Sequence, residues 1–321
     1  MNLTTEFVSN VQGVLLEDGR PYLDALPDLI AEASAQWGLK DVQPVPNLSY
    51  NFVAIANRPS PLTPLPLGEG NVVLKIGLPN RETKSEMAAL RLFDGKGACR
   101  LLEYDEERYW MLLERLMPGV MLSTMEDDEK ATHIAAEVMK RIWVSGLDTL
   151  RGEHAELLDQ RNNKFIQLTD WFYGGFERLR KHFNGETGPL NKKLVDRVKN
   201  SVNDFFAENH MPVLMHGDFH HYNILSSERG WLVIDPKGVI GPAGYEVGPF
   251  MMNPWGKFSY GINRQVIMKR IDILHEHLGF ERERILEWSL AHAILSAWWS
   301  IEDDTGWEYA ASFAEMLAEL K

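Results

Sequence analysis

The chain has 321 residues, of which 45% are hydrophobic and 25% charged, as in an ordinary globular protein with a large core. The formal net charge of −13 argues against a general nucleic-acid binder, because phosphate backbones would be repelled, and it would suit a cationic ligand. We expect a cytoplasmic protein without a membrane span, since neither a secretory leader nor a long apolar run is apparent and Cys99 is the single cysteine.

The first part of the chain predicts a small unit of short strands and two helices. Apolar residues at helical spacing alternate there with short apolar runs. The proline-rich stretch Arg58–Gly70 predicts a loop. Lys75 stands alone inside an apolar strand, where an ammonium group is costly unless it finds a partner. The expected helices are Leu23–Leu39 and Arg81–Phe93, and the expected strands are Val42–Val45, Phe52–Ala56, Val72–Ile76, Arg100–Tyr104 and Tyr109–Glu114.

The chain becomes mostly helical after the Pro118-Gly119 break. Two buried strands, Val213–Met215 and Trp231–Ile234, interrupt the helical pattern, and no internal repeat is apparent. The order indicates an α+β protein with a smaller lobe over residues 1–116 and a larger one over 117–321. The expected helices of the second lobe are Asp127–Gly146, Gln160–Phe183, Leu190–Glu208, Arg264–Leu278, Arg282–Ile301 and Trp307–Leu320.

The most informative polar residues lie between and after those two strands. His216, Asp218 and Asn223 have the spacing H-x-D-x-x-x-x-N, and Asp235 directly follows the second strand. Phosphoryl transfer from a nucleotide to a hydroxyl group needs a carboxylate near the attacking oxygen, and a carboxylate and an amide oxygen on magnesium. Asp218 would accept or orient the hydroxyl proton, while Asn223 and Asp235 would hold Mg²⁺.

The same passage, HGDFHHYNIL…GWLVIDPKGVIGPAGYEVGPF…NPW, resembles the aminoglycoside phosphotransferases, and within them the streptomycin 6-kinase and hydroxyurea kinase branch. The resemblance is dense from Val213 to Trp255. It implies a two-lobed protein-kinase-like fold, with an antiparallel sheet in the small N-terminal lobe and a mostly helical C-terminal lobe. It also implies an ATP-dependent O-phosphotransferase of the antibiotic-resistance type, whose expected acceptor is a hydroxyl group of an aminoglycoside such as streptomycin.

The resemblance further implies the nucleotide contacts. Lys75 would reach the α- and β-phosphates and pair with Glu86, for which Glu82, one turn earlier, is the competitor. Glu114 and Leu116 would contact adenine through main-chain groups where the lobes join.

Neither a P-loop nor a glycine-rich kinase loop is found in the sequence, because no G-x-x-x-x-G-K-[ST] or G-x-G-x-x-G pattern occurs. The segment Asn47–Asn51 would therefore cover the phosphates without glycine, with Ser49 as a donor. Lys237, two residues after Asp235, would either neutralise phosphate charge or form a salt bridge with a neighbouring carboxylate.

Two other classes of protein are alternatives to a kinase. A metal-dependent hydrolase could bind zinc or iron through a cluster of histidine and aspartate side chains. That assignment leaves Lys75, Asn223 and Asp235 without roles. A catalytically silent binding protein on the kinase fold usually lacks one of the catalytic groups, and here all are present. The residues of the hydrolase cluster are His216, Asp218, His220 and His221.

Acidic residues near the end of the chain are the candidates for binding a cationic acceptor. Asp303 and Asp304, with Glu302, follow a predicted helix, and Glu246 lies shortly after the catalytic segment. The neighbouring Trp298–Trp299 pair offers an aromatic face for a cation, or else is part of the core.

Overall fold

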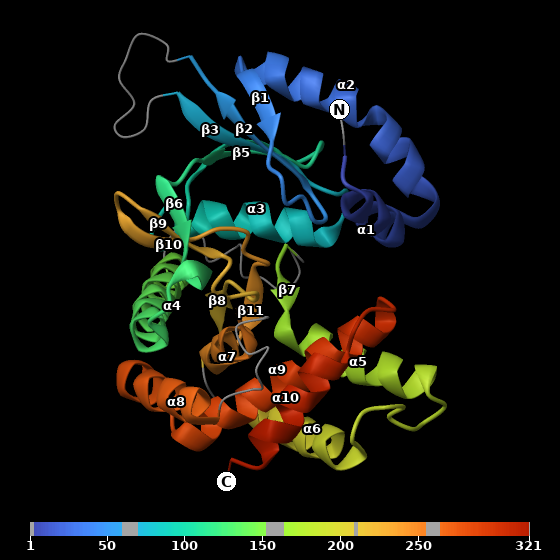
Figure 1. Ribbon diagram of the computed structural model, residues 1–321, viewed down its shortest axis with the longest axis vertical. Helices are drawn as coiled ribbons and strands as arrows, with labels where there is room; N and C mark the ends of the chain where they lie inside the picture. The colour runs from blue at the N-terminus through green and yellow to red at the C-terminus, as the bar shows by residue number, and fades with distance from the viewer. Residues whose placement is uncertain (1–2, 60–69, 152–163, 209–210, 255–263, 321) are drawn as a thin grey trace.

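The computed structural model describes residues 3–59, 70–151, 164–208, 211–254 and 264–320. Figure 1 shows two lobes, with a sheet and its covering helices above and a mostly helical body below. The predicted α+β fold is confirmed. No helix among the described residues is long and apolar enough to cross a membrane.

The upper lobe is built on a five-stranded antiparallel sheet. Its order is β1-β2-β3-β5-β4, so the strand that carries Lys75 lies in the centre. Every second residue of β2 is buried, which is the period expected of a strand with one face on the core. The strands are β1 (Lys40–Pro44), β2 (Phe52–Asn57), β3 (Asn71–Ile76), β4 (Leu101–Asp105) and β5 (Trp110–Glu114).

Helices cover both faces of this sheet. α1 (Thr5–Leu15), which the sequence analysis missed, and α2 (Gly19–Trp37) close one face in a separate apolar cluster, where Trp37 meets Trp110 edge to face with ring centroids 6.3 Å apart. α3 (Arg81–Phe93) lies between the sheet and the lower lobe (Figure 1). Its sequence ends are the predicted ones, and the Asn80 side chain caps its first turn.

The lower lobe packs around α9, whose residues are buried on almost every side. Trp288 of this helix stacks on Phe205 at a centroid distance of 4.5 Å. A helix that is apolar all round belongs in a core, and α9 accordingly contacts the helices before and after it. The helices are α4 (Asp128–Arg151), α5 (Leu168–His182), α6 (Lys192–Ala207), α7 (Val247–Met252), α8 (Arg264–Leu278), α9 (Arg282–Glu302) and α10 (Glu308–Ala318).

Two small sheets carry the central polar segment between the lobes. Asp218 and Asn223 lie in the loop from β8 to β9, and Asp235 follows β10. Four of the six strands escaped the sequence analysis because runs of two to four residues give little periodic signal. The strands are β6 (Pro118–Met121), β9 (Ile224–Ser227) and β10 (Gly230–Val233) in one sheet, and β7 (Ile166–Gln167), β8 (Val213–Met215) and β11 (Val239–Gly241) in the other.

Arg229, at the turn between β9 and β10, ties the two lobes together on one side. Its guanidinium donates to the carbonyl oxygen of Gly95 at 2.6 Å and to Glu114 Oε2 at 2.5 Å. Next to it, the Cys99 amide donates to the carbonyl oxygen of Val233 at 2.9 Å. We call this set of contacts the interlobe clasp.

Most predicted elements agree with the structure within a few residues, but the predicted helix Gln160–Phe183 begins only at Leu168, because Ile166–Gln167 forms β7 beside β11. The helix Arg264–Leu278 and the strand Val213–Met215 have the predicted ends. The start of the predicted helix Gln160–Phe183 and most of the predicted loop Arg58–Gly70 lie outside the described residues.

Candidate active site

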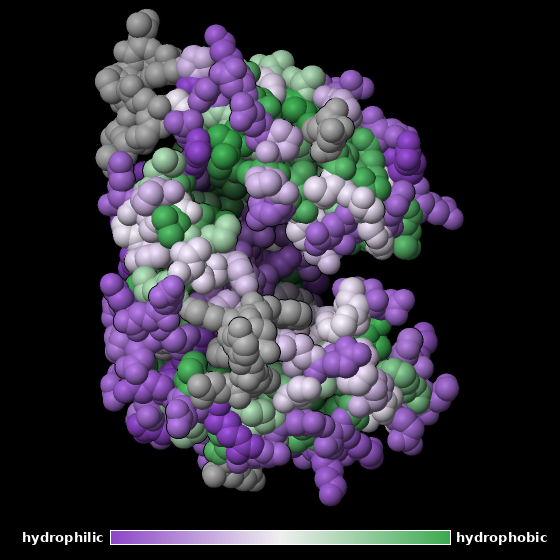
Figure 2. Space-filling view, viewed as in Figure 1, coloured by the Kyte–Doolittle hydropathy of each residue, from purple (hydrophilic) through white to green (hydrophobic). Residues whose placement is uncertain are grey.

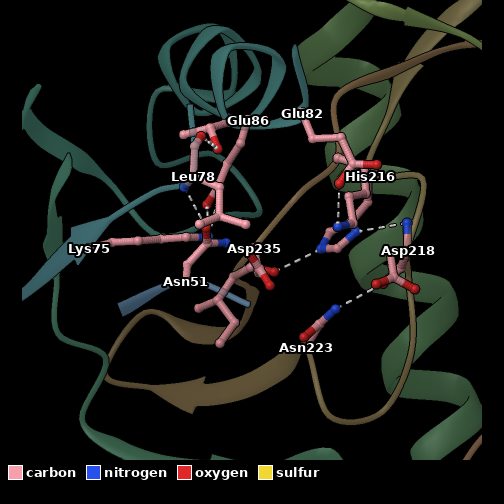
Figure 3. Close-up of polar contacts among 12 residues, drawn as sticks. Asn51, Lys75, Leu78, Glu82, Glu86, His216, Asp218, Asn223 and Asp235 are labelled. Atoms are coloured by element: carbon pink, nitrogen blue, oxygen red, sulfur yellow. Dashed lines mark hydrogen bonds and ion pairs between the residues drawn. The ribbon is translucent and has the colours of Figure 1, made fainter. Parts of the chain in front are cut away.

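His216 is a fully buried structural member of the central loop. Its Nε2–H donates to the carbonyl oxygen of Ile234 at 2.8 Å, and its Nδ1 accepts the Asp218 amide at 3.2 Å (Figure 3). Burial lowers the pKa of His216 to about 4, so the ring is neutral at pH 7. The imidazole thereby fixes the main chain at Asp218 to the residue that precedes Asp235.

Glu246 holds the same loop from below. Its carboxylate accepts the amides of His216 at 2.8 Å and Gly217 at 2.9 Å, and no part of the side chain is exposed. Gly217 has φ +84°, and a Cβ there would lie 2.3 Å from the side chain of Val239. The acceptor contact expected of Glu246 is therefore wrong, since this carboxylate positions the catalytic loop from inside the protein.

Asp218 presents its carboxylate to the cleft. The side chain is 38% exposed, and Oδ1 lies 3.5 Å from His220 Nε2. Burial alone would raise the pKa of Asp218, but the neighbouring His220 and Lys237 outweigh it and lower that pKa. The group is therefore an ionised proton acceptor at neutral pH.

Asn223 sits across the loop from Asp218. Its Nδ2 donates to the main-chain carbonyl of Asp218 at 3.0 Å, which leaves the amide Oδ1 as the atom able to bind a cation. The Ile234 amide donates to the Asn223 carbonyl oxygen at 3.0 Å. That bond brings Asn223 beside Asp235 although they are on different segments.

Lys75, Glu86 and Asp235 meet from three elements. Lys75 Nζ lies 2.7 Å from both carboxylate oxygens of Glu86, and both side chains are buried. It also forms an ion pair with Asp235, whose side chain is 47% exposed to the cleft. Burial would lower the pKa of Lys75, but the two carboxylates outweigh it and raise that pKa to about 12. Lys75 and Lys237 outweigh the effect of burial on Asp235 and hold its pKa well below the usual range.

Glu82, the competitor for Lys75, pairs with another lysine. Its Oε2 lies 3.0 Å from Lys237 Nζ, and the Lys237 amide donates to the carbonyl oxygen of His216 at 2.7 Å. The strand lysine thus takes Glu86, as expected. For Lys237 the salt bridge is present, and a role toward phosphate stays a prediction.

The segment expected to cover the phosphates is anchored at three points. Leu48 is buried, the Ser49 carbonyl accepts Asn10 Nδ2 from α1 at 3.2 Å, and Asn51 Oδ1 accepts the Leu78 amide at 3.0 Å. These contacts hold the loop without glycine. Ser49 itself is exposed, which leaves its hydroxyl accessible.

The side chain of Glu114 belongs to the interlobe clasp and points at Arg229, so only its main chain is suited to a ligand. Leu116 follows as a buried residue. No hydrogen bond to its main-chain amide or carbonyl is found within the described ranges. Both positions fit the main-chain contacts predicted for adenine.

The oxygen atoms in the cleft fit magnesium better than zinc. Asp235 and Asn223 supply a carboxylate and an amide oxygen, the hard ligands that Mg²⁺ prefers. Both ring nitrogens of His216 are bonded within the protein, and the ring of His221 stacks on Phe250 at 4.2 Å. Across the part of the chain that the structure describes, no group of three His, Cys, Asp or Glu residues could hold a metal ion. The hydrolase is therefore not favoured.

The acidic end of α9 faces the mouth of the cleft. Glu302 is neutralised by Arg178 of α5, at 2.5 Å. Burial and the charges of Glu302 and Glu82 raise the pKa of Asp303, and Asp303 in turn acts on Tyr50 of the opposite lobe. Figure 2 shows the hollow between the lobes, lined mainly by hydrophilic residues and open on the right of the view.

The tryptophan pair next to this acidic end divides between core and surface. Trp298 is 3% exposed, whereas Trp299 is partly exposed and meets Trp171 of α5 edge to face at 5.2 Å. Asp304 is exposed and adopts φ +51° after the helix end. Only Trp299 of the pair can therefore offer an aromatic surface.

Two buried neutral histidines make the stability of the fold sensitive to acid. Burial lowers the pKa values of His216 and of His292, on α9, to about 4, against 6.5 in an unfolded chain. Between these values the unfolded chain binds more protons, so the free energy of unfolding should fall as the pH is lowered from 6.5 to 4. The expected slope is about 1.4 kcal/mol per pH unit for each histidine.

Urea unfolding at several pH values between 7.5 and 5 measures this slope. His292→Gln removes one of the two histidines. The slope of the unfolding free energy against pH should then fall by the contribution of one histidine, about 1.4 kcal/mol per pH unit. Glu86 and Glu246, whose pKa values burial raises to about 7, add a slope of opposite sign to both proteins, so the difference between wild type and variant is the test. An equal slope in the wild type and in His292→Gln would contradict the assignment.

The chain is similar to known proteins over most of its length. A family model described as aminoglycoside/hydroxyurea antibiotic resistance kinase matches residues 48–304. Streptomycin 6-kinase of Streptomyces griseus is 30% identical over 298 residues, covering 89% of this chain and 87% of that protein. Hydroxyurea phosphotransferase of Kitasatospora aureofaciens is 30% identical over 293 residues, covering 89% and 76% respectively.

Solved structures agree on the fold. The choline kinase LicA from Streptococcus pneumoniae superposes with a TM-score of 0.60 at 13% identity, covering 92% of this chain and 98% of that chain. A thermostable aminoglycoside phosphotransferase APH(4)-Ia in a ternary complex with ADP and hygromycin B gives a TM-score of 0.57 at 14% identity, covering 90% and 96%.

Proposed function

Because the chain belongs to the aminoglycoside/hydroxyurea antibiotic resistance kinase family, we propose that it transfers the γ-phosphoryl group of ATP to a hydroxyl group of a small cationic acceptor such as streptomycin, with Mg²⁺ and in the cytoplasm. The enzyme class, a phosphotransferase with an alcohol group as acceptor, follows from the family. The metal, the acceptor and the individual residue roles are the proposal.

The meeting of Lys75, Glu86 and Asp235 beside the Asp218 loop carries this proposal. A buried strand lysine held by a helix glutamate is the arrangement that positions a lysine at nucleotide phosphates. We assign residues 1–116 to nucleotide binding and residues 117–321 to catalysis and acceptor binding. In the first part, Ser49 would donate to a phosphate, and the main chains of Glu114 and Leu116 would bind adenine.

Catalysis would rest on positioning and charge neutralisation in a direct, in-line transfer. The acceptor oxygen forms its bond to the γ-phosphorus as the bond from that phosphorus to the β,γ-bridging oxygen breaks, and Asp218 takes the hydroxyl proton. Lys75 and Lys237 supply positive charge on the phosphate side. Asn223 and Asp235 would hold Mg²⁺, which when bound neutralises phosphate charge.

A magnesium–ATP assay against streptomycin, other aminoglycosides, hydroxyurea and small polyols tests the function. We expect ADP release that depends on acceptor and Mg²⁺, and a product that carries one additional phosphate by mass spectrometry. ADP release without any phosphorylated acceptor would contradict the proposal. Hydrolysis of a member of the panel with Zn²⁺ and without a nucleotide would indicate a hydrolase instead.

The acidic mouth of the cleft predicts how a cationic acceptor binds. Burial, and after it the neighbouring carboxylates Glu302 and Glu82, raise the pKa of Asp303, and a bound cation would favour its ionised form. Replacing Asp303 and Asp304 together by Asn should therefore raise the KM for streptomycin several-fold, while the KM for ATP hardly changes. Steady-state kinetics with each substrate varied in turn measures both constants, and an unchanged KM for streptomycin would refute the cationic contact.

A further inference from the structure

A second buried histidine, His292 of α9, shares a hydrogen bond with a buried tyrosine. The Tyr245 hydroxyl lies 3.0 Å from His292 Nδ1, and the two residues are 0% and 5% exposed. Burial raises the pKa of Tyr245 well above its ordinary value and lowers that of His292 to about 4, so both groups are neutral at pH 7.

The bonding of the tyrosine hydroxyl indicates the tautomer of the imidazole. The Tyr245 O–H has no other acceptor among the described residues, so it donates to Nδ1, and the ring proton then lies on Nε2. Among the described residues no acceptor for this Nε2–H is found, and Nε2 is not one of the enclosed polar atoms that lack a partner, so it is open to solvent. His292 therefore holds an oriented hydrogen-bond donor that the fold itself does not use.

The donor lies next to the catalytic loop. Tyr245 is followed directly by Glu246, whose carboxylate holds the loop that carries Asp218, so one short turn positions both the loop and His292. The charges that act on the His292 ring are those of Asp218 and His220.

The ring is also held by its helix and bordered by aromatic side chains. A Cβ on Gly248 of α7 would lie 2.5 Å from His292 Cβ, so the two helices are in close contact at that point. Trp299, two turns further along α9, lies with its ring centroid 6.4 Å from that of His292. Trp171 meets Trp299 edge to face, and both indoles are partly exposed.

We propose that His292 is an acceptor-binding residue, whose Nε2–H donates to an acceptor oxygen adjacent to the hydroxyl that faces Asp218, with Trp171 and Trp299 along the side of the bound molecule. This inference rests on the proposed kinase function and narrows its substrate class to acceptors with two neighbouring oxygens, such as a cyclitol or sugar ring. An acceptor without the second oxygen leaves a buried donor unpaired, which is costly, and is therefore rejected.

Three variants separate this role from a structural one. His292→Leu removes the donor and should raise the KM for streptomycin about 10-fold or more, the value of one hydrogen bond to a buried group, with the KM for ATP unchanged. His292→Gln keeps an N–H near the position of Nε2 and should recover part of the loss. Tyr245→Phe keeps the imidazole but removes the hydroxyl that bonds to Nδ1, so the ring proton can then lie on either nitrogen. This variant should raise the KM for streptomycin by a smaller factor.

Thermal unfolding of each variant identifies any that fail to fold. If His292→Leu does not fold, the test uses the two conservative variants His292→Gln and Tyr245→Phe. Folded variants with an unchanged KM for streptomycin would overturn the inference while the wild-type activity upholds the kinase. Equal rises in both KM values would also overturn it, since they indicate general damage to the cleft. A wild-type protein that phosphorylates no member of the acceptor panel would remove both proposals.

Discussion

Replacing Asp218 by Asn is expected to lower kcat by roughly 100-fold or more, the usual contribution of a positioned acid or base. The amide cannot take the hydroxyl proton, whereas the carboxylate is kept ionised by the neighbouring His220 and Lys237. The substitution leaves the main-chain bonds of Asp218 in place, since Asn223 and His216 contact only its carbonyl and its amide. The fold and the affinity for nucleotide should therefore be retained.

Asp24→Asn on α2 is a suitable control, because that carboxylate is exposed and pairs only with Arg20 in the described structure. It should have wild-type kcat. Circular dichroism and nucleotide titration establish that the Asp218 variant is folded and binds ATP. Turnover within a few-fold of the wild type in that folded variant would exclude Asp218 as the proton acceptor.

Asp235→Ala is expected to abolish magnesium-dependent nucleotide binding, and Asn223→Ala to weaken it less, because a carboxylate is the stronger ligand for a hard cation. The protein should remain folded in the first variant. Lys75 keeps Glu86 and Lys237 keeps Glu82 as counter-ions, so neither ammonium group is left buried without a partner.

Calorimetric titration of ADP with and without Mg²⁺ measures the effect as the gain in affinity that the metal provides. The wild type should show a large gain, Asn223→Ala a smaller one and Asp235→Ala none. Glu17→Ala, at an exposed position of the N-terminal lobe, serves as the matched loss of one carboxylate. An equal gain in all four proteins would show that the metal binds elsewhere.

Those parts of the site whose residues lie close together in the chain could be predicted from the sequence. The spacing from His216 to Asn223 and the position of Asp235 after a strand are local patterns, and the lone lysine in β3 conflicts with its apolar surroundings unless it has a partner. A charged residue in an apolar strand is a local inconsistency that can be read from the sequence, and such inconsistencies are typical of functional sites. The choice of Glu86 over Glu82 needed the family resemblance, because both lie on one face of α3.

Contacts between distant segments could not be predicted in the same way. Glu246 is separated by thirty residues from the His216 amide that it holds, and nothing local distinguishes it from an acceptor-binding carboxylate. Its place in the apolar run YEVGPF was the available signal, since a carboxylate buried there must bind main-chain donors. His292 and Arg229 are similar cases, because each acts through a partner on another element.

The interlobe clasp has a consequence for how the two lobes can move. Arg229 bonds to Gly95 and Glu114, and the Cys99–Val233 bridge lies beside it, so the lobes are joined by main-chain and charged contacts at that side. On the opposite side, Figure 2 shows the open hollow between the lobes.

We expect the lobes to open by a hinge rotation about the interlobe clasp. Displacement would be smallest at the clasp, beside the predicted adenine contacts, and largest at the mouth, where Asp303 lies near enough to Tyr50 of the other lobe for its charge to raise the pKa of that tyrosine. We therefore expect acceptors to enter and leave the cleft when the lobes move apart at its mouth. The predicted adenine contacts beside the clasp would hardly move. In this geometry the phosphorylated product can be released while the nucleotide stays in place.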